Sequence, residues 1–133
     1  MKIVIPGGTG QVGTMLARAM VAAGHEVVVL TRQVRPAPWR LVAWDAETLG
    51  PWTTELEGAE VVVNLAGRSV DCRYNAANRA EIMASRVNST RLVGQAIAQA
   101  KRPPRLWLQA STATIYAHRY DAPNNEATGI LGG

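Results

Sequence analysis

Three glycines near the amino terminus carry the clearest chemical signal in the sequence. They are Gly7, Gly10 and Gly13, in the run Gly-Gly-Thr-Gly-Gln-Val-Gly. At this spacing the first glycine permits a tight turn, the second lets the backbone approach a ligand closely, and the third lets a helix pack against a strand. The free N–H groups at the start of that helix favour a bound phosphate. The spacing therefore predicts a site for the diphosphate of a dinucleotide, to which we also assign Gln11 and Val12.

The residues on either side of the turn match what such a site requires. Residues 2–6 form a short apolar run that predicts a buried strand. Over residues 11–23 the apolar side chains recur at helical spacing and predict one buried helix face, made of Val12, Met15, Leu16, Ala19, Met20 and Ala23. A strand before the turn and an amphipathic helix after it favour a phosphate site over the alternative, a glycine-rich turn without a ligand.

A second position bears on which dinucleotide would bind. About twenty residues after the glycine turn, at the end of a second predicted strand over residues 27–30, the chain has Thr31 and Arg32. A carboxylate there would bind the ribose 2′-hydroxyl of NAD, whereas a guanidinium pairs with the 2′-phosphate of NADP. The sequence therefore favours NADP over NAD. A solvated arginine on a loop is the alternative.

The rest of the chain continues the alternation of strands and helices. We expect further strands over residues 41–44, 61–65 and 106–110 and a short helix over 52–56. A long helix is expected over 75–100, with Met83, Val87, Val93 and Ile97 on its buried side. This alternation indicates parallel strands joined by right-handed crossovers. The predicted fold is α/β, a doubly wound parallel sheet of the Rossmann type. The commonest dinucleotide fold has six strands, so we expect the sheet of this chain to be truncated after the fifth strand.

Four segments together resemble the extended short-chain dehydrogenase/reductase superfamily, and more narrowly its NAD(P)-dependent epimerase/dehydratase-like branch. They are the glycine turn with Thr31-Arg32, Asn-Leu-Ala-Gly at residues 64–67, Ser-Arg-Val-Asn-Ser-Thr-Arg at 85–91, and Ala-Ser-Thr-Ala-Thr-Ile-Tyr at 110–116. They follow the order of the family and span nearly the whole chain. The resemblance implies that residues 1–133 are a dinucleotide-binding Rossmann domain whose carboxy-terminal substrate-binding part is missing.

The resemblance also assigns roles to cofactor-binding residues. It places the cofactor ring and ribose against Leu65, Ala66 and Gly67, whose small or apolar side chains stand where parallel strands bind ligands. A plain turn after the strand is the alternative. It further implies that Asp45 contacts the adenine amino group, although an exposed loop aspartate explains that residue equally well.

Candidate catalytic residues follow from the same resemblance. Thr112, with Ser111 as the second choice, would hydrogen-bond the reacting oxygen of the substrate, and Asn88 would hold the active-site backbone and a water. Tyr116 would line the substrate pocket or pack under it. The alternatives are hydroxyls that end a strand by bonding to the backbone, and an asparagine on the solvent face of its helix.

The acid–base pair that is usual in this superfamily is absent from the sequence. It consists of a tyrosine and a lysine four residues apart, but the lysines here, Lys2 and Lys101, do not follow a tyrosine at that spacing. Two functions therefore remain open. The first is an NADP-dependent oxidoreductase or epimerase acting by hydride transfer on a sugar-like or other hydroxylated small molecule. The second is a non-catalytic dinucleotide sensor or regulatory module.

Composition narrows the class of protein. The 133 residues suffice for one domain, and 47% hydrophobic with 18% charged residues excludes a disordered chain. No apolar run is long enough for a membrane span or a secretory signal, so we expect a cytoplasmic protein. Cys72, His25 and His118 do not suggest a zinc cluster, and we expect no metal.

The net charge and the long predicted helix indicate which kinds of partner to expect. The net charge of +4 comes from scattered basic residues without interleaved aromatic residues. This favours a phosphate-bearing small molecule over a nucleic acid. The predicted helix over residues 75–100 would serve as the face of a homodimer, but packing on its own sheet explains its apolar side equally well.

Overall fold

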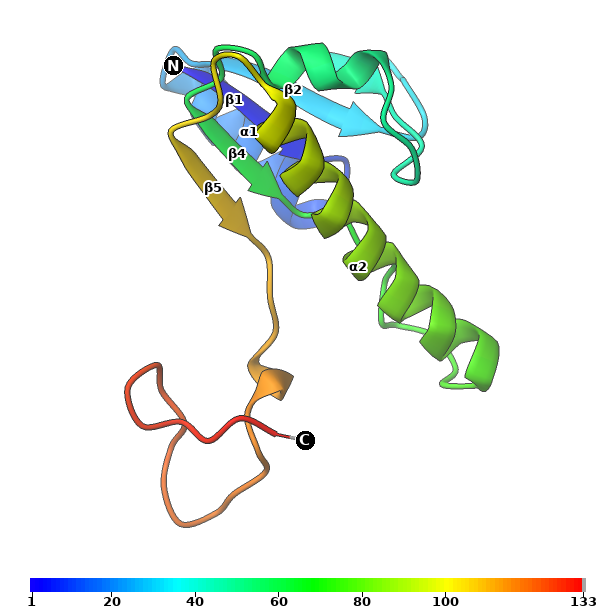
Figure 1. Cartoon of the computed structure of the whole chain (residues 1–133), viewed down its shortest axis with the longest axis vertical. Coiled ribbons are helices and arrows are strands. Elements are labelled where there is room, and N and C mark those ends of the chain that lie inside the picture. Colours follow the sequence, from blue (N-terminus) through cyan, green and yellow to red (C-terminus); the bar gives the residue numbers. More distant parts are fainter. Residues whose placement is uncertain (133) are drawn as a thin grey trace.

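The computed structural model describes residues 1–132, and its centre is a parallel β-sheet (Figure 1). Five strands are present in the described part of the chain, in the spatial order β3-β2-β1-β4-β5. Every neighbouring pair is parallel. The strands are β1 (Lys2–Pro6), β2 (Glu26–Thr31), β3 (Arg40–Ala43), β4 (Val61–Asn64) and β5 (Leu106–Gln109). This is the order of the first five strands of the Rossmann fold, so the predicted fold class is confirmed.

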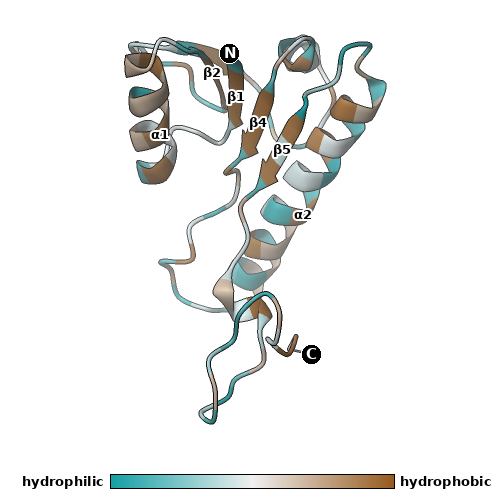
Figure 2. Cartoon of the chain, turned by 90° about the vertical axis from the view of Figure 1, so that its left-hand side faces the viewer, coloured by the Kyte–Doolittle hydropathy of each residue, from teal (hydrophilic) through white to brown (hydrophobic). Residues whose placement is uncertain are grey.

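Helices cover both faces of the sheet. Helix α1 (Gln11–Ala22) lies on one face and helix α2 (Ala76–Gln99) on the other, as Figure 2 shows. Short 3₁₀ helices are formed by η1 (Pro51–Leu56), on the α2 side, and η2 (Ala113–Ile115), beyond β5. Each of the elements predicted from the sequence is present, with bounds that differ by a residue at most.

The core has two layers because successive side chains of a strand point to opposite faces of the sheet. Val4, Val28 and Val62 pack with Trp52, Leu56 and Val93 on the α2 side. Ile3, Ile5, Val27 and Val29 pack with Ala17 on the α1 side. Both sets are buried, which explains why these strands read as continuous apolar runs rather than alternating ones.

The predicted buried face of α1 is wrong in part. Val12 and Met15 are 67% and 64% exposed, whereas Gly13 and Ala17 are buried. The helix meets the sheet and the glycine turn through these small residues, with Leu16, Met20 and Val21 alongside them. Close backbone approach, rather than the largest apolar side chains, therefore sets the orientation of α1.

The predicted buried side of α2 is also wrong in its first half. Val93 is buried and Ile97 packs against the core, but Met83 and Val87 are 66% and 42% exposed. Figure 1 shows the reason: the amino-terminal half of α2 extends past the carboxyl edge of the sheet, where no strand lies beneath it. The contacts of the helix with the core are made by its second half, chiefly through Ser89, Leu92, Val93 and Ala96.

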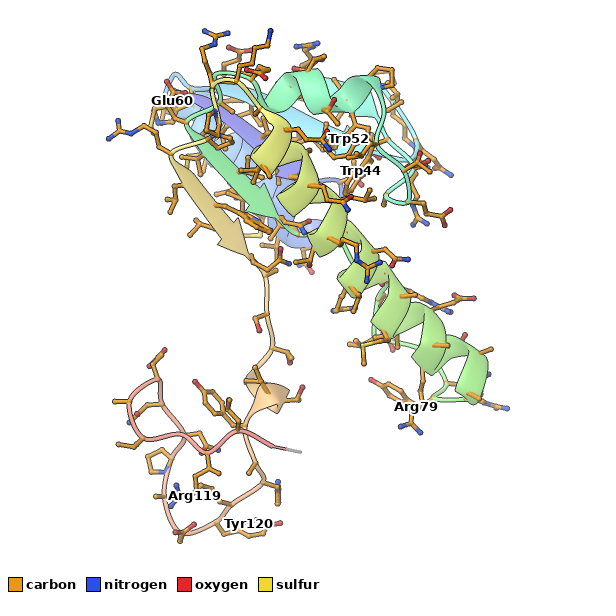
Figure 3. The ribbon with its side chains drawn as sticks, viewed as in Figure 1. Trp44, Trp52, Glu60, Arg79, Arg119 and Tyr120 are labelled. Atoms are coloured by element: carbon orange, nitrogen blue, oxygen red, sulfur yellow. The ribbon has the colours of Figure 1, made fainter. Side chains whose placement is uncertain are left out.

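Strand β5 forms one edge of the sheet and is exposed along its length. After β5 the chain leaves the sheet, and Figure 3 shows Arg119 and Tyr120 well away from it. An isolated antiparallel bridge joins Tyr116 to Leu131 in this segment. Within residues 1–132, no helix is long and apolar enough to cross a membrane.

Candidate functional site

The carboxyl ends of β1, β2 and β4 border a groove of about 1370 Å³. It lies where the strand order reverses, since β1 is paired with β2 on one side and β4 on the other. Open α/β sheets bind ligands at such a position. Many of the residues predicted from the sequence line this groove: Gly7, Gly10, Thr31, Arg32, Asp45, Leu65, Ala66, Gly67 and Asn88.

Gly7 joins two turns that form the floor of the groove. Its φ is +72°, a conformation that side-chain-bearing residues rarely adopt, and a Cβ atom there would lie 2.6 Å from the Cα of Ala66. Backbone hydrogen bonds tie the turns to neighbouring strands, from Gly7 N to Leu30 O and from Leu65 N to Pro6 O, each 2.9 Å. Gly7 is therefore needed for packing between the turns after β1 and β4.

Gly13 and Gly10 differ in what surrounds them. A Cβ on Gly13 would lie 2.4 Å from the Cα of Gly8, so this glycine lets α1 sit directly on the turn. A Cβ on Gly10 would meet no atom of the described residues within 4 Å, and its φ of −73° and ψ of 180° suit any residue. Neither strain nor packing requires glycine at position 10.

The helix start beside Gly10 is suited to an anion. Gly10 is the N-cap of α1 and supplies no side chain to bond the first N–H groups of the helix. Those amides and the positive end of the helix dipole face the open space at Gly10. Gln11 and Val12 occupy the first helical positions, and both side chains are exposed outside the groove lining.

A short turn after β2 directs two arginines along the groove. The Thr31 hydroxyl accepts a hydrogen bond from Gln33 N and donates one to Gln33 O, both 3.2 Å. Arg32 and Arg35 line the groove, and Arg35 Nη2 donates to Gln33 Oε1 at 2.5 Å. Among the described residues Arg32 has no salt-bridge partner. Sequence reasoning missed Arg35, although its position three residues after Arg32 on the same loop was the available signal.

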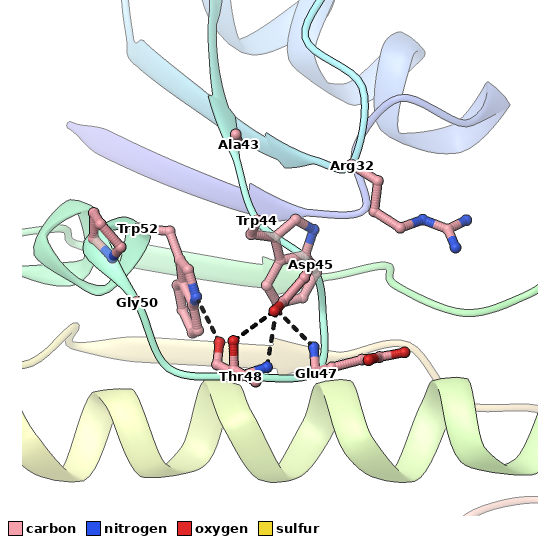
Figure 4. Close-up of a pocket in the computed structure, with 9 residues that line it drawn as sticks. Arg32, Ala43, Trp44, Asp45, Glu47, Thr48, Gly50 and Trp52 are labelled. Atoms are coloured by element: carbon pink, nitrogen blue, oxygen red, sulfur yellow. Dashed lines mark hydrogen bonds between the residues drawn. The ribbon is translucent and has the colours of Figure 1, made fainter.

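The Asp45 carboxylate stabilises its own loop, beside a smaller pocket of about 500 Å³ (Figure 4). Its oxygens accept hydrogen bonds from the Thr48 hydroxyl at 2.5 Å, from Thr48 N at 2.8 Å and from Glu47 N at 2.9 Å. These bonds favour the charged form, and the Thr48 hydroxyl contributes most to lowering the pKa of Asp45 from 3.8 to about 2. The sequence did not reveal this turn, in which Ala46 adopts a φ of 62°.

Two buried tryptophans hold the far side of the Asp45 loop. Trp52 Nε1 donates to Thr48 O at 3.0 Å, and the rings of Trp44 and Trp52 pack edge to face with centroids 5.3 Å apart. Both side chains are almost fully buried, and Trp44 also lines the groove. The loop is therefore fixed to the core from one side and shaped by Asp45 from the other.

Asn64 organises the end of β4. It is fully buried, donates from Nδ2 to Gln109 Oε1 at 2.9 Å, and accepts from Ala66 N at 3.1 Å. One side chain thus links β4 to β5 and shapes the turn that presents Leu65 and Ala66 to the groove.

Residues from α2 close the groove opposite the glycine turn. Asn88 is half-buried and lines the groove, which places it on the side facing the site rather than on the solvent face. Ser111, Thr112 and Tyr116 do not line it. The Thr112 hydroxyl bonds to Thr114, and the Tyr116 ring packs against Gly129. The catalytic and substrate roles suggested for these four residues stay predictions.

Comparison with known proteins identifies relatives of this chain. Epimerase family protein SDR39U1 of Bos taurus is 35% identical over 129 residues, which cover 95% of this chain and 42% of that protein. Epimerase family protein YfhF of Bacillus subtilis is 35% identical over 119 residues, or 87% of this chain and 39% of that protein. The chain thus spans well under half the length of the relatives it matches.

Solved structures share the fold. The crystal structure of human SDR39U1 (isoform 2) with NADPH has a TM-score of 0.80 and 29% identity, over 97% of this chain and 43% of that one. UDP-N-acetylglucosamine 4-epimerase from Bacillus cereus has a TM-score of 0.74 at 23% identity, over 98% and 42% of the two chains, which shows a common fold alone. Residues 3–130 of the chain match the sequence profile of the NAD-dependent epimerase/dehydratase family. Because this match spans nearly the whole chain, the chain belongs to the NAD-dependent epimerase/dehydratase family.

Proposed function

We propose that this chain is the dinucleotide-binding part of an NADP-dependent oxidoreductase or epimerase that acts on a sugar-like or other hydroxylated small molecule. Membership of the family and the likeness to a relative solved with NADPH support a nicotinamide dinucleotide as the ligand. A bound nicotinamide supplies the hydride acceptor and donor. The contribution of the protein is to bind and orient it.

The observation that carries the proposal is the open space at Gly10. The other two motif glycines are explained by contacts within the protein, whereas Gly10 is not. A ligand that comes close to the backbone at the start of α1 accounts for glycine there. A diphosphate fits this position because unbonded N–H groups and the helix dipole both attract negative charge.

The preference for NADP rests on Arg32. This guanidinium lines the groove at the end of β2, where NAD-binding proteins have a carboxylate. With no salt bridge to another described residue, it is available to pair with a 2′-phosphate. Arg35, on the same loop, adds a second positive charge to this end of the groove.

Binding measurements test the proposal. NADPH and NADH are titrated by calorimetry into the full-length protein and into Arg32→Ala, with Arg79→Ala as a control on a distant exposed arginine. We expect the wild type to bind NADPH more tightly than NADH. In Arg32→Ala the ratio of the two dissociation constants should fall by about tenfold or more. In Arg79→Ala the ratio should not change. Equal affinities that the substitution leaves unchanged would refute NADP selectivity. If neither dinucleotide binds, the proposed function itself is refuted.

A sensor or regulatory module is the second candidate. The groove and the glycine turn would account for binding of a dinucleotide, which a sensor shares with an enzyme. The full-length protein incubated with NADP and hydroxylated substrates would distinguish the two. A change in nicotinamide absorbance supports an enzyme, whereas tight binding without turnover supports a sensor.

A further inference from the structure

The loop after β4 is held against α2 by side chains of two consecutive helix residues. Ser85 Oγ accepts from Arg68 N at 2.9 Å, and Arg86 Nη1 donates to Arg68 O at 3.0 Å. Both polar groups of the Arg68 backbone are therefore bonded to α2. The Arg68 side chain adds a salt bridge to Glu81, one turn earlier on the same helix.

Arg86 also lies directly against Gly67. A Cβ on Gly67 would be 3.1 Å from Cζ of Arg86 and 3.2 Å from its Nη1. The φ of Gly67 is outside the left-handed region, so the backbone conformation does not require glycine. The family resemblance accounts for Gly67 by the nearness of a cofactor, and the structure shows a second reason: a side chain there would press on Arg86.

The position of these contacts ties them to the groove. Gly67, Arg68 and Ser85 line it, whereas Arg86, an exposed residue of α2, contacts Gly67 and Arg68 without lining the groove. In the proposed function the diphosphate would lie at Gly10 and the 2′-phosphate at Arg32, which would leave the side formed by Gly67 and α2 for the nicotinamide half of the dinucleotide. Arg86 would then support the wall that faces this half.

We infer that Arg86 is a positioning residue for the cofactor site, which it serves by holding the backbone of Gly67 and Arg68 against α2. The inference rests on the proposed function. Arg86 donates a charge-assisted hydrogen bond to a carbonyl, which is stronger than a neutral one. Without it the loop has more conformational freedom, and cofactor binding must then order it, which weakens the affinity.

Dinucleotide affinities and stability, measured together on the full-length protein, test this role. We expect Arg86→Ala to raise the dissociation constants of NADPH and NADH by the same factor, about tenfold, because the contacts lie far from the 2′-phosphate. Arg86→Lys retains a donor and should recover part of the loss. Arg79→Ala is the matched control, since Arg79 lies on the same helix at its far end from the sheet (Figure 3).

The outcomes separate this inference from the proposed function. If the wild type binds no dinucleotide, the proposed function fails. If the wild type binds and Arg86→Ala binds equally well, or loses NADPH affinity alone, the positioning role is refuted.

A second variant covers the case in which Arg86→Ala unfolds too easily to be titrated. Gly67→Ala introduces the Cβ that would press on Arg86, so it should weaken binding in the wild type and have little further effect when Arg86 is alanine. Urea unfolding midpoints of the double-mutant cycle report the same coupling without cofactor. Additive effects of the two substitutions on binding and on unfolding would overturn the inference.

Discussion

Gly10→Ala separates the ligand-binding role of the glycine turn from its folding role. The new methyl group would point into open space from a backbone conformation that alanine readily adopts. Alanine is a poorer N-cap than glycine by about 0.5–1 kcal/mol. It also restricts the unfolded chain, which stabilises the folded state by about 0.4–1 kcal/mol. These effects oppose each other, so the free energy of unfolding should change by less than about 0.5 kcal/mol.

Cofactor binding should respond much more strongly to the same change. The methyl group would occupy the space through which a diphosphate reaches the first N–H groups of α1. Loss of one hydrogen bond to a charged group costs about 1.5–3 kcal/mol. The affinity for NADPH should therefore fall by about tenfold to a hundredfold.

Gly13→Ala provides the contrasting variant. Its Cβ would stand 2.4 Å from backbone atoms of Gly8, so something in the turn or helix must shift. Overpacking of this kind typically costs about 1–3 kcal/mol. Urea unfolding followed by tryptophan fluorescence measures stability, since Trp44 and Trp52 are buried in the core, and calorimetric titration measures NADPH affinity. The reasoning is refuted if Gly10→Ala destabilises the protein as much as Gly13→Ala does, or binds NADPH as tightly as the wild type.

Two further predictions concern the loops that border the groove. The folded-state pKa of Asp45 lies below its ordinary value, so its hydrogen bonds stabilise the protein above pH 3.8 and this contribution is lost as the pH falls toward about 2. Asp45→Asn cannot lose this contribution, so its free energy of unfolding should fall less than that of the wild type as the pH is lowered from 3.8 toward about 2. If the two proteins lose stability in parallel over this pH range, the prediction is wrong. Asn64→Ala removes the bonds of a fully buried side chain to Ala66 and Gln109, so the free energy of unfolding should fall by about 2 kcal/mol or more. A midpoint shift no larger than that of a Gln95→Ala control, at an exposed position of α2, would count against this role of Asn64.

The fold was largely predictable because its strands are uniform. Continuous apolar runs bounded by glycine, proline and polar residues located all five, and alternation with helices indicated parallel pairing. The buried faces of the helices were harder to predict. Hydrophobic periodicity assigns large apolar residues such as Val12 and Met83 to the buried face. However, α1 contacts the sheet through Gly13 and Ala17, and Met83 lies on a part of α2 with no strand beneath it. A helix pattern does not reveal how far the helix extends past the sheet.

The lining of the groove was predictable in part, but its contacts were not. Gly7, Gly10, Arg32 and the segment after β4 line the groove, whereas Gln11, Val12, Gly13 and the candidate residues after β5 do not. The partners of these residues lie far away in sequence: Gly7 packs on Ala66, Gly67 on Arg86, and Asn64 bonds to Gln109. No local pattern encodes such pairs. The bonds of Asp45 are local, but an aspartate that shapes its own turn looks the same in sequence as one that faces a ligand.

The glycines around the groove therefore have two different roles. Some are needed for packing within the protein, and one leaves room for a ligand. A Cβ on Gly7 or Gly13 would strike backbone atoms, so their replacement disturbs the turns and helix themselves, and a Cβ on Gly67 would press on the Arg86 side chain. Gly10 has no such neighbour among the described residues. A variant that keeps these three glycines and replaces Gly10 should retain the Rossmann sheet but bind the dinucleotide about tenfold to a hundredfold more weakly. Substitution of Gly10 should accordingly report on binding rather than on folding, because a Cβ there meets no atom of the described residues within 4 Å.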